Sequence, residues 1–132
     1  MREKIIAWLE SEEKFYLLVE IYLLEGNVKN ALIALERIRS HWGIEELRFT
    51  VSRAAKESYP QDTIRILMED IENFINRRGR DNYAEAAQRL YEVRATYQYL
   101  KEIKTWDKLI ACLREEYKRL PALQDELNKM KL

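Results

Sequence analysis

The fold is decided by residues 77–117, RRGRDNYAEAAQRLYEVRATYQYLKEIKTWDKLIACLREEY. Apolar residues recur here every three or four positions, which predicts two amphipathic helices. Neither helix can cover its apolar stripe alone, so we expect the pair to close into a hairpin that stacks on similar neighbours. The first stripe comprises Ala84, Ala87, Leu90, Tyr91 and Tyr97, and the second comprises Trp106, Leu109, Ile110, Leu113 and Tyr117.

A weaker copy of this stretch lies 75 positions earlier in the chain. The offset pairs Tyr97 with Tyr22, Trp106 with Ala31, Ile110 with Leu35, Leu113 with Ile38 and Tyr117 with Trp42. In the earlier copy, Tyr22, Gly26 and Ala31 stand at the spacing found in tetratricopeptide repeats. The sequence therefore predicts an internal helical repeat.

Breaks at Gly26, at residues 41–43 and at Pro60 divide the rest of the chain into further helical segments. The expected helices are a short one at 2–10, one capped by Ser11, then Val28 to about Ser40, Ile44 to about Ser58, and four more capped or begun by Asp62, Asn82, Thr105 and Pro121. Hairpins would begin near residues 11, 44 and 82, a period typical of paired-helix repeats. We predict one all-α domain over residues 1–132, built of about seven helices in stacked antiparallel pairs similar to tetratricopeptide repeats.

The composition excludes several classes of protein. Twenty-three basic residues balance twenty-three acidic ones, so no overall field attracts nucleic acid or anionic lipid. The longest apolar run, FYLLV at 15–19, is far shorter than the roughly 20 residues of a membrane span. The charged N-terminal segment does not fit a secretory signal, and we predict a cytoplasmic protein.

Residues with catalytic or metal-binding chemistry are scarce. The chain has one cysteine, Cys112, and one histidine, His41, which excludes an intrachain disulfide and a Cys/His zinc site. We expect Cys112 near the core and His41 at a helix end. No phosphate-binding loop or metalloprotease motif is present, and the carboxylates are interpreted as a solvated face. The sequence predicts no enzyme, no cofactor and no metal.

The strongest candidate for an anion or partner contact is the cluster of Arg77, Arg78, Arg80 and Tyr83. One interpretation is a phosphate or acidic-peptide contact at the junction of two helices. The other, which we favour, is that the cations complement a helix C-terminus and aid solubility.

A second candidate surface is the stripe of Ile5, Ile6 and Leu9 in the short first helix. That helix resembles the second half of a hairpin, so we expect it to be an unfinished end of the stack. It would then pair with its copy in a homodimer or receive a preceding segment of a longer parent protein. Tyr99 is expected at the surface, where tyrosine is a good interface anchor.

The C-terminal part carries one further pattern. The step Arg78-Gly79-Arg80 leads into a helix rich in Tyr and Ala, a helix with Trp106 follows, and Pro121-Ala122-Leu123 comes near the end. The other matching positions are Tyr83, Ala86, Ala87, Leu90, Arg94, Tyr97, Leu113, Arg119 and Leu127. This arrangement resembles the helical tail of bacterial SWIM zinc-finger proteins. The resemblance implies a helical accessory region of a longer protein, but this chain lacks the Cys/His zinc site.

The sequence therefore favours one function and leaves one alternative. The first is a non-catalytic protein-interaction (scaffold) module that binds a protein or peptide in a groove between stacked hairpins. The alternative is an accessory domain of a nucleic-acid-associated SWIM zinc-finger-type protein, contacting phosphates through the arginine cluster. Salt dependence separates them, because phosphate contacts weaken steeply as salt is added.

Overall fold

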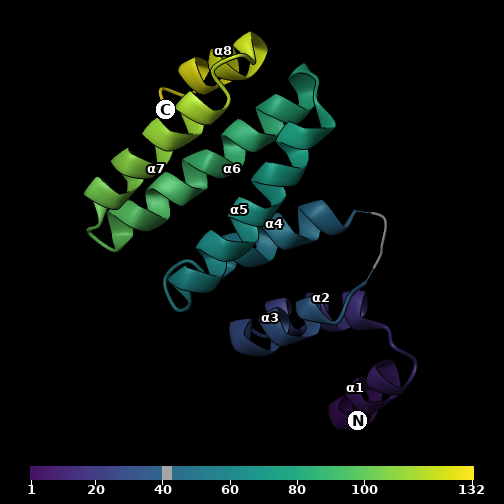
Figure 1. Ribbon diagram of the computed structural model, residues 1–132. Helices are drawn as coiled ribbons and strands as arrows, with labels where there is room; N and C mark the ends of the chain where they lie inside the picture. Colours follow the sequence, from purple (N-terminus) through teal and green to yellow (C-terminus); the bar gives the residue numbers. More distant parts are fainter. Residues whose placement is uncertain (40–42) are drawn as a thin grey trace. The chain divides into compact units, whose positions relative to one another are not determined.

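The protein is all-helical in the computed structural model, which describes residues 1–39 and 43–132 (Figure 1). These residues form eight helices and no strand, and they confirm the predicted all-α fold of packed helix pairs, with the short N-terminal helix added to seven others. The helices are α1 (Arg2–Ser11), α2 (Phe15–Leu24), α3 (Val28–Glu36), α4 (Ile44–Ala54), α5 (Pro60–Arg77), α6 (Arg80–Tyr99), α7 (Ile103–Glu116) and α8 (Pro121–Lys129). The chain divides into two compact units, Met1–Ala55 and Lys56–Leu132.

The first unit is organised around the antiparallel pair of α2 and α3, which make the most extensive contact in it. Ala31 is fully buried and Ala34 nearly so, and their small side chains let the two helices approach closely. Helix α1 packs on α2 and buries Leu9. The other buried apolar residues of α2 and α3 are Phe15, Leu18, Val19, Tyr22, Leu32 and Leu35.

The turn between α2 and α3 has the same geometry as the turn between α6 and α7. The N–H of Asn27 donates to the carbonyl of Tyr22 at 2.8 Å, and the N–H of Glu102 donates to the carbonyl of Tyr97 at 2.9 Å. In each turn the preceding residue, Gly26 or Lys101, has a positive φ, as in a Schellman motif. The helices after the turns begin 75 residues apart, at positions 28 and 103. The predicted offset is therefore present in the backbone.

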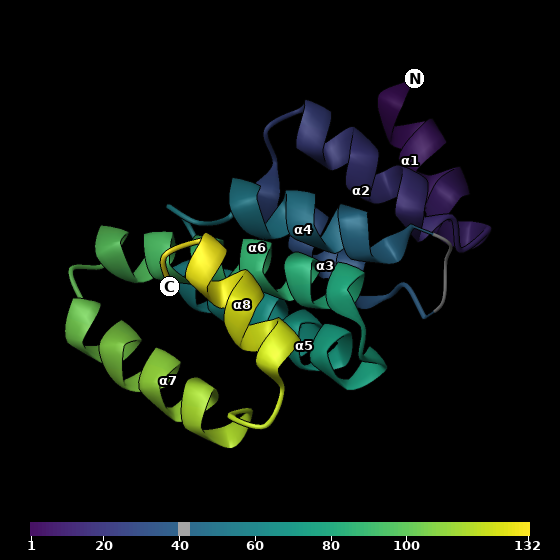
Figure 2. The ribbon, with the colours of Figure 1, turned by 90° about the horizontal axis from the view of Figure 1, so that it is seen from above.

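The second unit is built around α6, which packs against α5, α7 and α8 (Figure 2). The predicted hairpin of α6 and α7 is present, but α6 makes its most extensive contact with α5. The reason is that α5 buries eight side chains, whereas α7 fully buries only Trp106 and Leu113. Apolar side chains with no more than 1% exposure form the centre of this unit: Ile66, Leu67, Ile71, Ile75, Ala86, Ala87, Leu90, Val93, Leu123 and Leu127.

A buried arginine lies in the interface of α5 and α6. Arg89 has no exposed surface, and its guanidinium lies 4.5 Å from the ring centroid of Phe74. Its Nη1 donates to the carboxylate of Glu85 at 2.6 Å, which gives the buried cation a counter-charge one turn earlier on the same helix. The helical pattern of the sequence did not predict a charged residue at this position.

Several predicted helix caps are wrong by a few residues. Ser11 is the last residue of α1, and Asn82 lies inside α6, whose N-cap is Gly79. The Asn82 side chain donates to the carbonyl of Arg78 at 2.8 Å, so it serves the end of α5. Helices α5 and α7 likewise begin before Asp62 and Thr105, and α4 ends earlier than predicted, whereas Pro121 does begin α8. The predicted role of His41 falls outside the described residues.

No helix within residues 1–39 and 43–132 combines the length and the apolarity that a membrane span needs. A single domain over residues 1–132 stays a prediction.

Candidate functional site

The four residues of the predicted anion contact do not form one surface. Tyr83 is buried, with 5% of its surface exposed, so it belongs to the core of the second unit. The guanidinium of Arg77 lies 5.0 Å from the Phe74 ring centroid, as a cation–π contact. Arg78 ends α5 and is exposed. This placement supports the interpretation that these cations close a helix.

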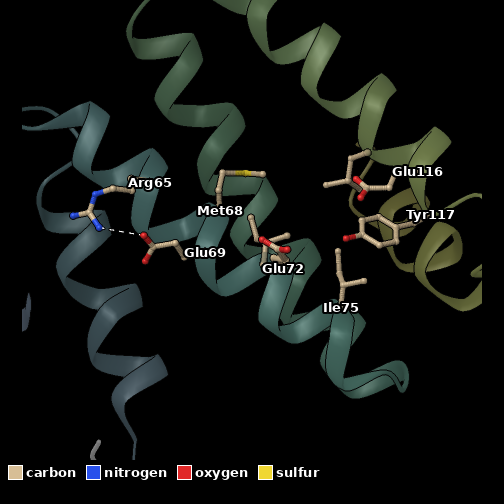
Figure 3. A pocket seen from close by; sticks show the side chains of 9 residues that line it. Arg65, Met68, Glu69, Glu72, Ile75, Glu116 and Tyr117 are labelled. Carbon is tan, nitrogen blue, oxygen red and sulfur yellow. Dashed lines mark hydrogen bonds and ion pairs between the residues drawn. The ribbon is translucent and has the colours of Figure 1, made fainter. Parts of the chain in front are cut away.

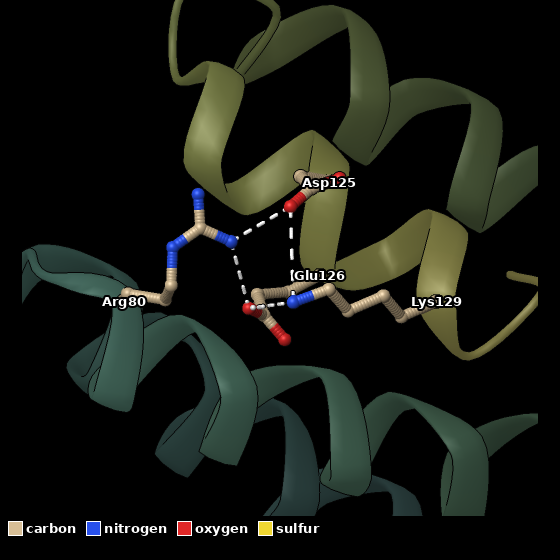
Figure 4. A network of polar contacts seen from close by, with 4 residues as sticks. All are labelled: Arg80, Asp125, Glu126 and Lys129. Atoms are coloured by element: carbon tan, nitrogen blue, oxygen red, sulfur yellow. Dashed lines mark hydrogen bonds and ion pairs between the residues drawn. The ribbon is translucent and has the colours of Figure 1, made fainter.

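Arg80 is held by acidic side chains of α8 (Figure 4). Its Nη1 donates to Asp125 at 2.7 Å and to Glu126 at 2.9 Å. The Nζ of Lys129 lies 3.2 Å from the same Glu126 oxygen and 3.8 Å from Asp125. The network fastens the start of α6 to α8. Arg80 is therefore engaged within the unit and does not present an open cation to an anionic ligand.

Replacement of Arg80 with Gln is expected to change how the stability of the protein depends on pH. Hydrogen bonds from Arg80 hold the pKa of Asp125 and of Glu126 below their ordinary values of 3.8 and 4.5. A depressed carboxyl pKa stabilises the folded state above the ordinary value, and this contribution is lost as the pH falls through the folded pKa. The wild type should therefore exceed Arg80→Gln in free energy of unfolding near neutral pH, and the gap should narrow below pH 4.5.

Urea unfolding followed by circular dichroism at several pH values measures this gap. Arg119→Gln is a suitable control, because it removes an exposed cation from the same unit. A difference between wild type and Arg80→Gln that stays constant down to pH 3 would contradict the assignment.

The predicted interface residues are divided between the core and the surface. Leu9 is buried in its own unit and Ile6 is half-buried, so neither is available as an open surface. Ile5 is exposed, and Trp8, which the sequence analysis did not single out as an interface residue, lies exposed one turn along α1. Tyr99 is exposed, as predicted. A homodimer through α1 stays a prediction that sedimentation can decide, and it now depends on Ile5 and Trp8.

A groove of about 410 Å³ lies between α5 and α7, entirely within the second unit (Figure 3). Its floor is apolar and consists of Met68, Ile71 and Ile75 from α5 and Leu113 from α7. Ile71, Ile75 and Leu113 are at most 7% exposed, so the floor is part of the packed core, while Met68 is partly exposed. The base of the groove is therefore formed by the packed core of the second unit.

The edge of this groove is acidic. Glu69 and Glu72 come from α5, Glu116 comes from α7, and Arg65 lies at one end. Arg65 donates to Glu69 at 3.3 Å, so that carboxylate already has a cation. Within the described part of the chain, no cation forms an ion pair with Glu72 or Glu116. Two carboxylates on facing helices are thus open to a basic partner.

The charges of both carboxylates act on Tyr117, which directly follows Glu116 at the end of α7 and faces Glu72 of α5. Burial raises the pKa of the Tyr117 hydroxyl, the negative charges of Glu116 and Glu72 raise that pKa further, and Arg78 opposes them. The hydroxyl therefore stays protonated and can donate a hydrogen bond. In Figure 3 it is directed toward α5.

A metal site needs its ligating residues in a specific geometry. No group of three or more His, Cys, Asp or Glu residues in residues 1–39 and 43–132 is placed to hold a metal ion. Cys112 is exposed, so its predicted place near the core is wrong. What the groove offers is an apolar floor, two open carboxylates and a phenolic hydroxyl, which suits binding.

The sequence carries a signal for only one half of the groove. Met68, Ile71 and Ile75 follow the apolar stripe of α5, with Glu69 and Glu72 directly beside it. The carboxylates were interpreted as a solvated face, which holds for Glu69 and Glu72 but is wrong for Asp70, which is 4% exposed. The α7 half of the groove cannot be deduced from this pattern, because α5 and α7 come together only through their packing on α6.

Comparisons with known proteins place this fold in a family. Residues 43–130 match the family described as Ku C-terminal domain like. The chain belongs to that family. Its members carry a helical domain of a protein-interaction type, and both helices of the groove lie within the matched residues.

One curated relative is the uncharacterized protein YwqB of Bacillus subtilis (strain 168). It is 35% identical over 91 residues, which cover 69% of this chain and 17% of YwqB. The chain thus spans less than a fifth of the length of that relative. No solved structure matches the chain.

Proposed function

We propose that this chain is a non-catalytic protein-interaction module, acting as a scaffold that binds a segment of a partner protein in the groove between α5 and α7. The observation that carries the proposal is the apolar floor beneath an acidic edge, within a domain of the Ku C-terminal-domain-like family. That family is named for a kinase-binding part of Ku, which supports a protein as the partner here. We expect the module to act in the cytoplasm.

Grooves between packed helices bind peptides through a few apolar anchors. An amphipathic segment places side chains at i, i+3 or i+4 and i+7 into such a groove, and polar residues at the edge fix its orientation. The partly exposed Met68, above a base of Ile71, Ile75 and Leu113, offers apolar surface for these anchors, and the edge offers two carboxylates and a hydroxyl.

Selection from a random-peptide display library tests the proposal. The immobilised folded chain should enrich a recurring peptide pattern, and a synthetic peptide of that pattern should bind saturably, with one site, by isothermal titration calorimetry. An urea-unfolded sample of the same chain is the control for non-specific capture. Failure of the folded chain to enrich any pattern beyond the unfolded sample would contradict an interaction function.

The alternative proposal is an accessory domain of a SWIM zinc-finger-type protein that contacts nucleic acid. The exposed Arg78, together with Arg77, supports it. The engagement of Arg80 with α8 weakens it. If the first proposal holds, Arg77→Gln, Arg78→Gln should leave any affinity for duplex DNA nearly unchanged, in a titration monitored by fluorescence anisotropy. Loss of a salt-sensitive DNA complex in this double variant, with its helicity intact, would favour the alternative.

A further inference from the structure

We infer that the segment recognised by the α5–α7 groove is a short basic amphipathic peptide, with bulky apolar anchors on the floor and Lys or Arg residues between Glu72 and Glu116. This inference rests on the proposed function and specifies the partner of the same site. Acidic peptides and basic peptides without apolar anchors are outcomes of the test.

The floor of the groove selects for bulky apolar side chains. Ile71 and Ile75 are at most 1% exposed and Leu113 is 7% exposed, so they form the base of the groove without a polar group and add little accessible surface. Met68 is partly exposed at the floor, and the flexible, polarizable methionine side chain adapts to anchors of different shape. The floor therefore favours Leu, Met or aromatic anchors over polar ones.

The edge of the groove selects for positive charge. Glu72 and Glu116 belong to facing helices, and their charges act together on the Tyr117 hydroxyl. A cation above Tyr117 would approach both carboxylates at once, and a guanidinium could also lie over the Tyr117 ring. Such exposed charges contribute more to the choice of partner and to the rate of association than to affinity.

The same charges disfavour the competing partners. A phosphate or an acidic side chain on the floor would face Glu72 and Glu116, the two carboxylates whose charges act on Tyr117, with Arg78 opposing them. Like-charge juxtaposition across an interface is strongly unfavourable. The groove therefore discriminates by charge as well as by shape.

The test uses three synthetic peptides and the whole chain. The first probe is a helical amphipathic Leu/Lys peptide, the second replaces every Lys with Glu, and the third is oligolysine, which has charge but no anchors. Affinities are measured by calorimetry, and the binding site is mapped by NMR from the methyl shifts of Met68, Ile71, Ile75 and Leu113.

Two double variants separate the groove from the general charge of the protein. Glu72→Gln, Glu116→Gln removes the open carboxylates, while Asp107→Asn, Glu115→Gln removes two exposed acids that do not line the groove. Both variants change the net charge equally. We expect the Leu/Lys peptide to bind the groove variant about tenfold more weakly than wild type, a difference of about 1.4 kcal/mol, and the control variant as wild type.

The inference is overturned if the Leu/Glu peptide or oligolysine binds as tightly as the Leu/Lys peptide, or if both double variants weaken it equally. It is also overturned if the Leu/Lys peptide shifts methyls only outside the groove or does not bind. In these cases the proposed interaction function is still tested separately, because the random-peptide selection detects peptides of any composition bound at any surface of the chain.

Discussion

The Trp106→Ala variant should unfold at a much lower temperature than the wild type. Trp106 is 4% exposed, and with Leu113 it is one of only two fully buried side chains of α7. Truncating a buried tryptophan costs ~3–5 kcal/mol, because the lost transfer free energy adds to the cost of the cavity. Each kcal/mol lowers the melting temperature of a domain of this size by roughly 4–8 °C. The helix that forms one wall of the groove should detach first.

Thermal melting followed by circular dichroism measures the effect, and amide hydrogen exchange shows whether α7 loses protection before the rest of the second unit. Ile103→Ala is the control, because Ile103 begins the same helix but is 42% exposed. It should shift the midpoint only slightly. A Trp106→Ala midpoint within a degree or two of wild type would show that Trp106 contributes nothing to the packing of α7.

The burial of Trp106 could be predicted because α7 has a narrow apolar stripe. Trp106, Leu109, Ile110 and Leu113 recur with the helical period, and the structure buries or half-buries all of them. Cys112 lies one position from Leu113, about 100° around the helix, and this is enough to expose it. When a helix packs on one side only, a strong helical period in its sequence thus predicts which of its side chains are buried.

The same reasoning fails for α6 because that helix packs on three others. Its buried side chains extend around more than one face and include Arg89 and Thr96 as well as Leu90. Tyr91, which was predicted to face inward, is 45% exposed. A central helix has no single apolar stripe, so its sequence period cannot show which residues are inside.

Helix ends were also hard to predict, because left-handed turns in this chain do not depend on glycine alone. Gly26 marks the turn after α2, but Glu13 and Lys101 have positive φ at the equivalent positions after α1 and α6. Such residues adopt this conformation at a cost of about 1–2 kcal/mol and carry no sequence signal for it. The helices after the Glu13 and Lys101 turns were therefore predicted to begin at the wrong residue, whereas α3 begins at Val28 as predicted.

The Phe74→Ala variant is expected to be as damaging as Trp106→Ala, for a different reason. Phe74 is 7% exposed, and its ring lies against the guanidinium of Arg89, which has no exposed surface. Removing the ring opens a cavity, at ~3–5 kcal/mol. It also takes away a desolvated cation–π contact of up to ~2 kcal/mol. Urea unfolding followed by circular dichroism measures the loss.

Two further variants separate these contributions. Phe74→Leu keeps most of the buried volume and removes the ring, so it should lower the free energy of unfolding less than Phe74→Ala does. It should still lower it more than Arg77→Ala does. Arg77→Ala removes the exposed guanidinium that lies 5.0 Å from the ring centroid. The exposed cation–π contact contributes only ~0.5–1 kcal/mol. If Phe74→Ala cost no more than Arg77→Ala, the ring would not be the support of Arg89. The contact between α5 and α6 would then have to depend on aliphatic residues alone. This contact supports α7, and therefore also the groove.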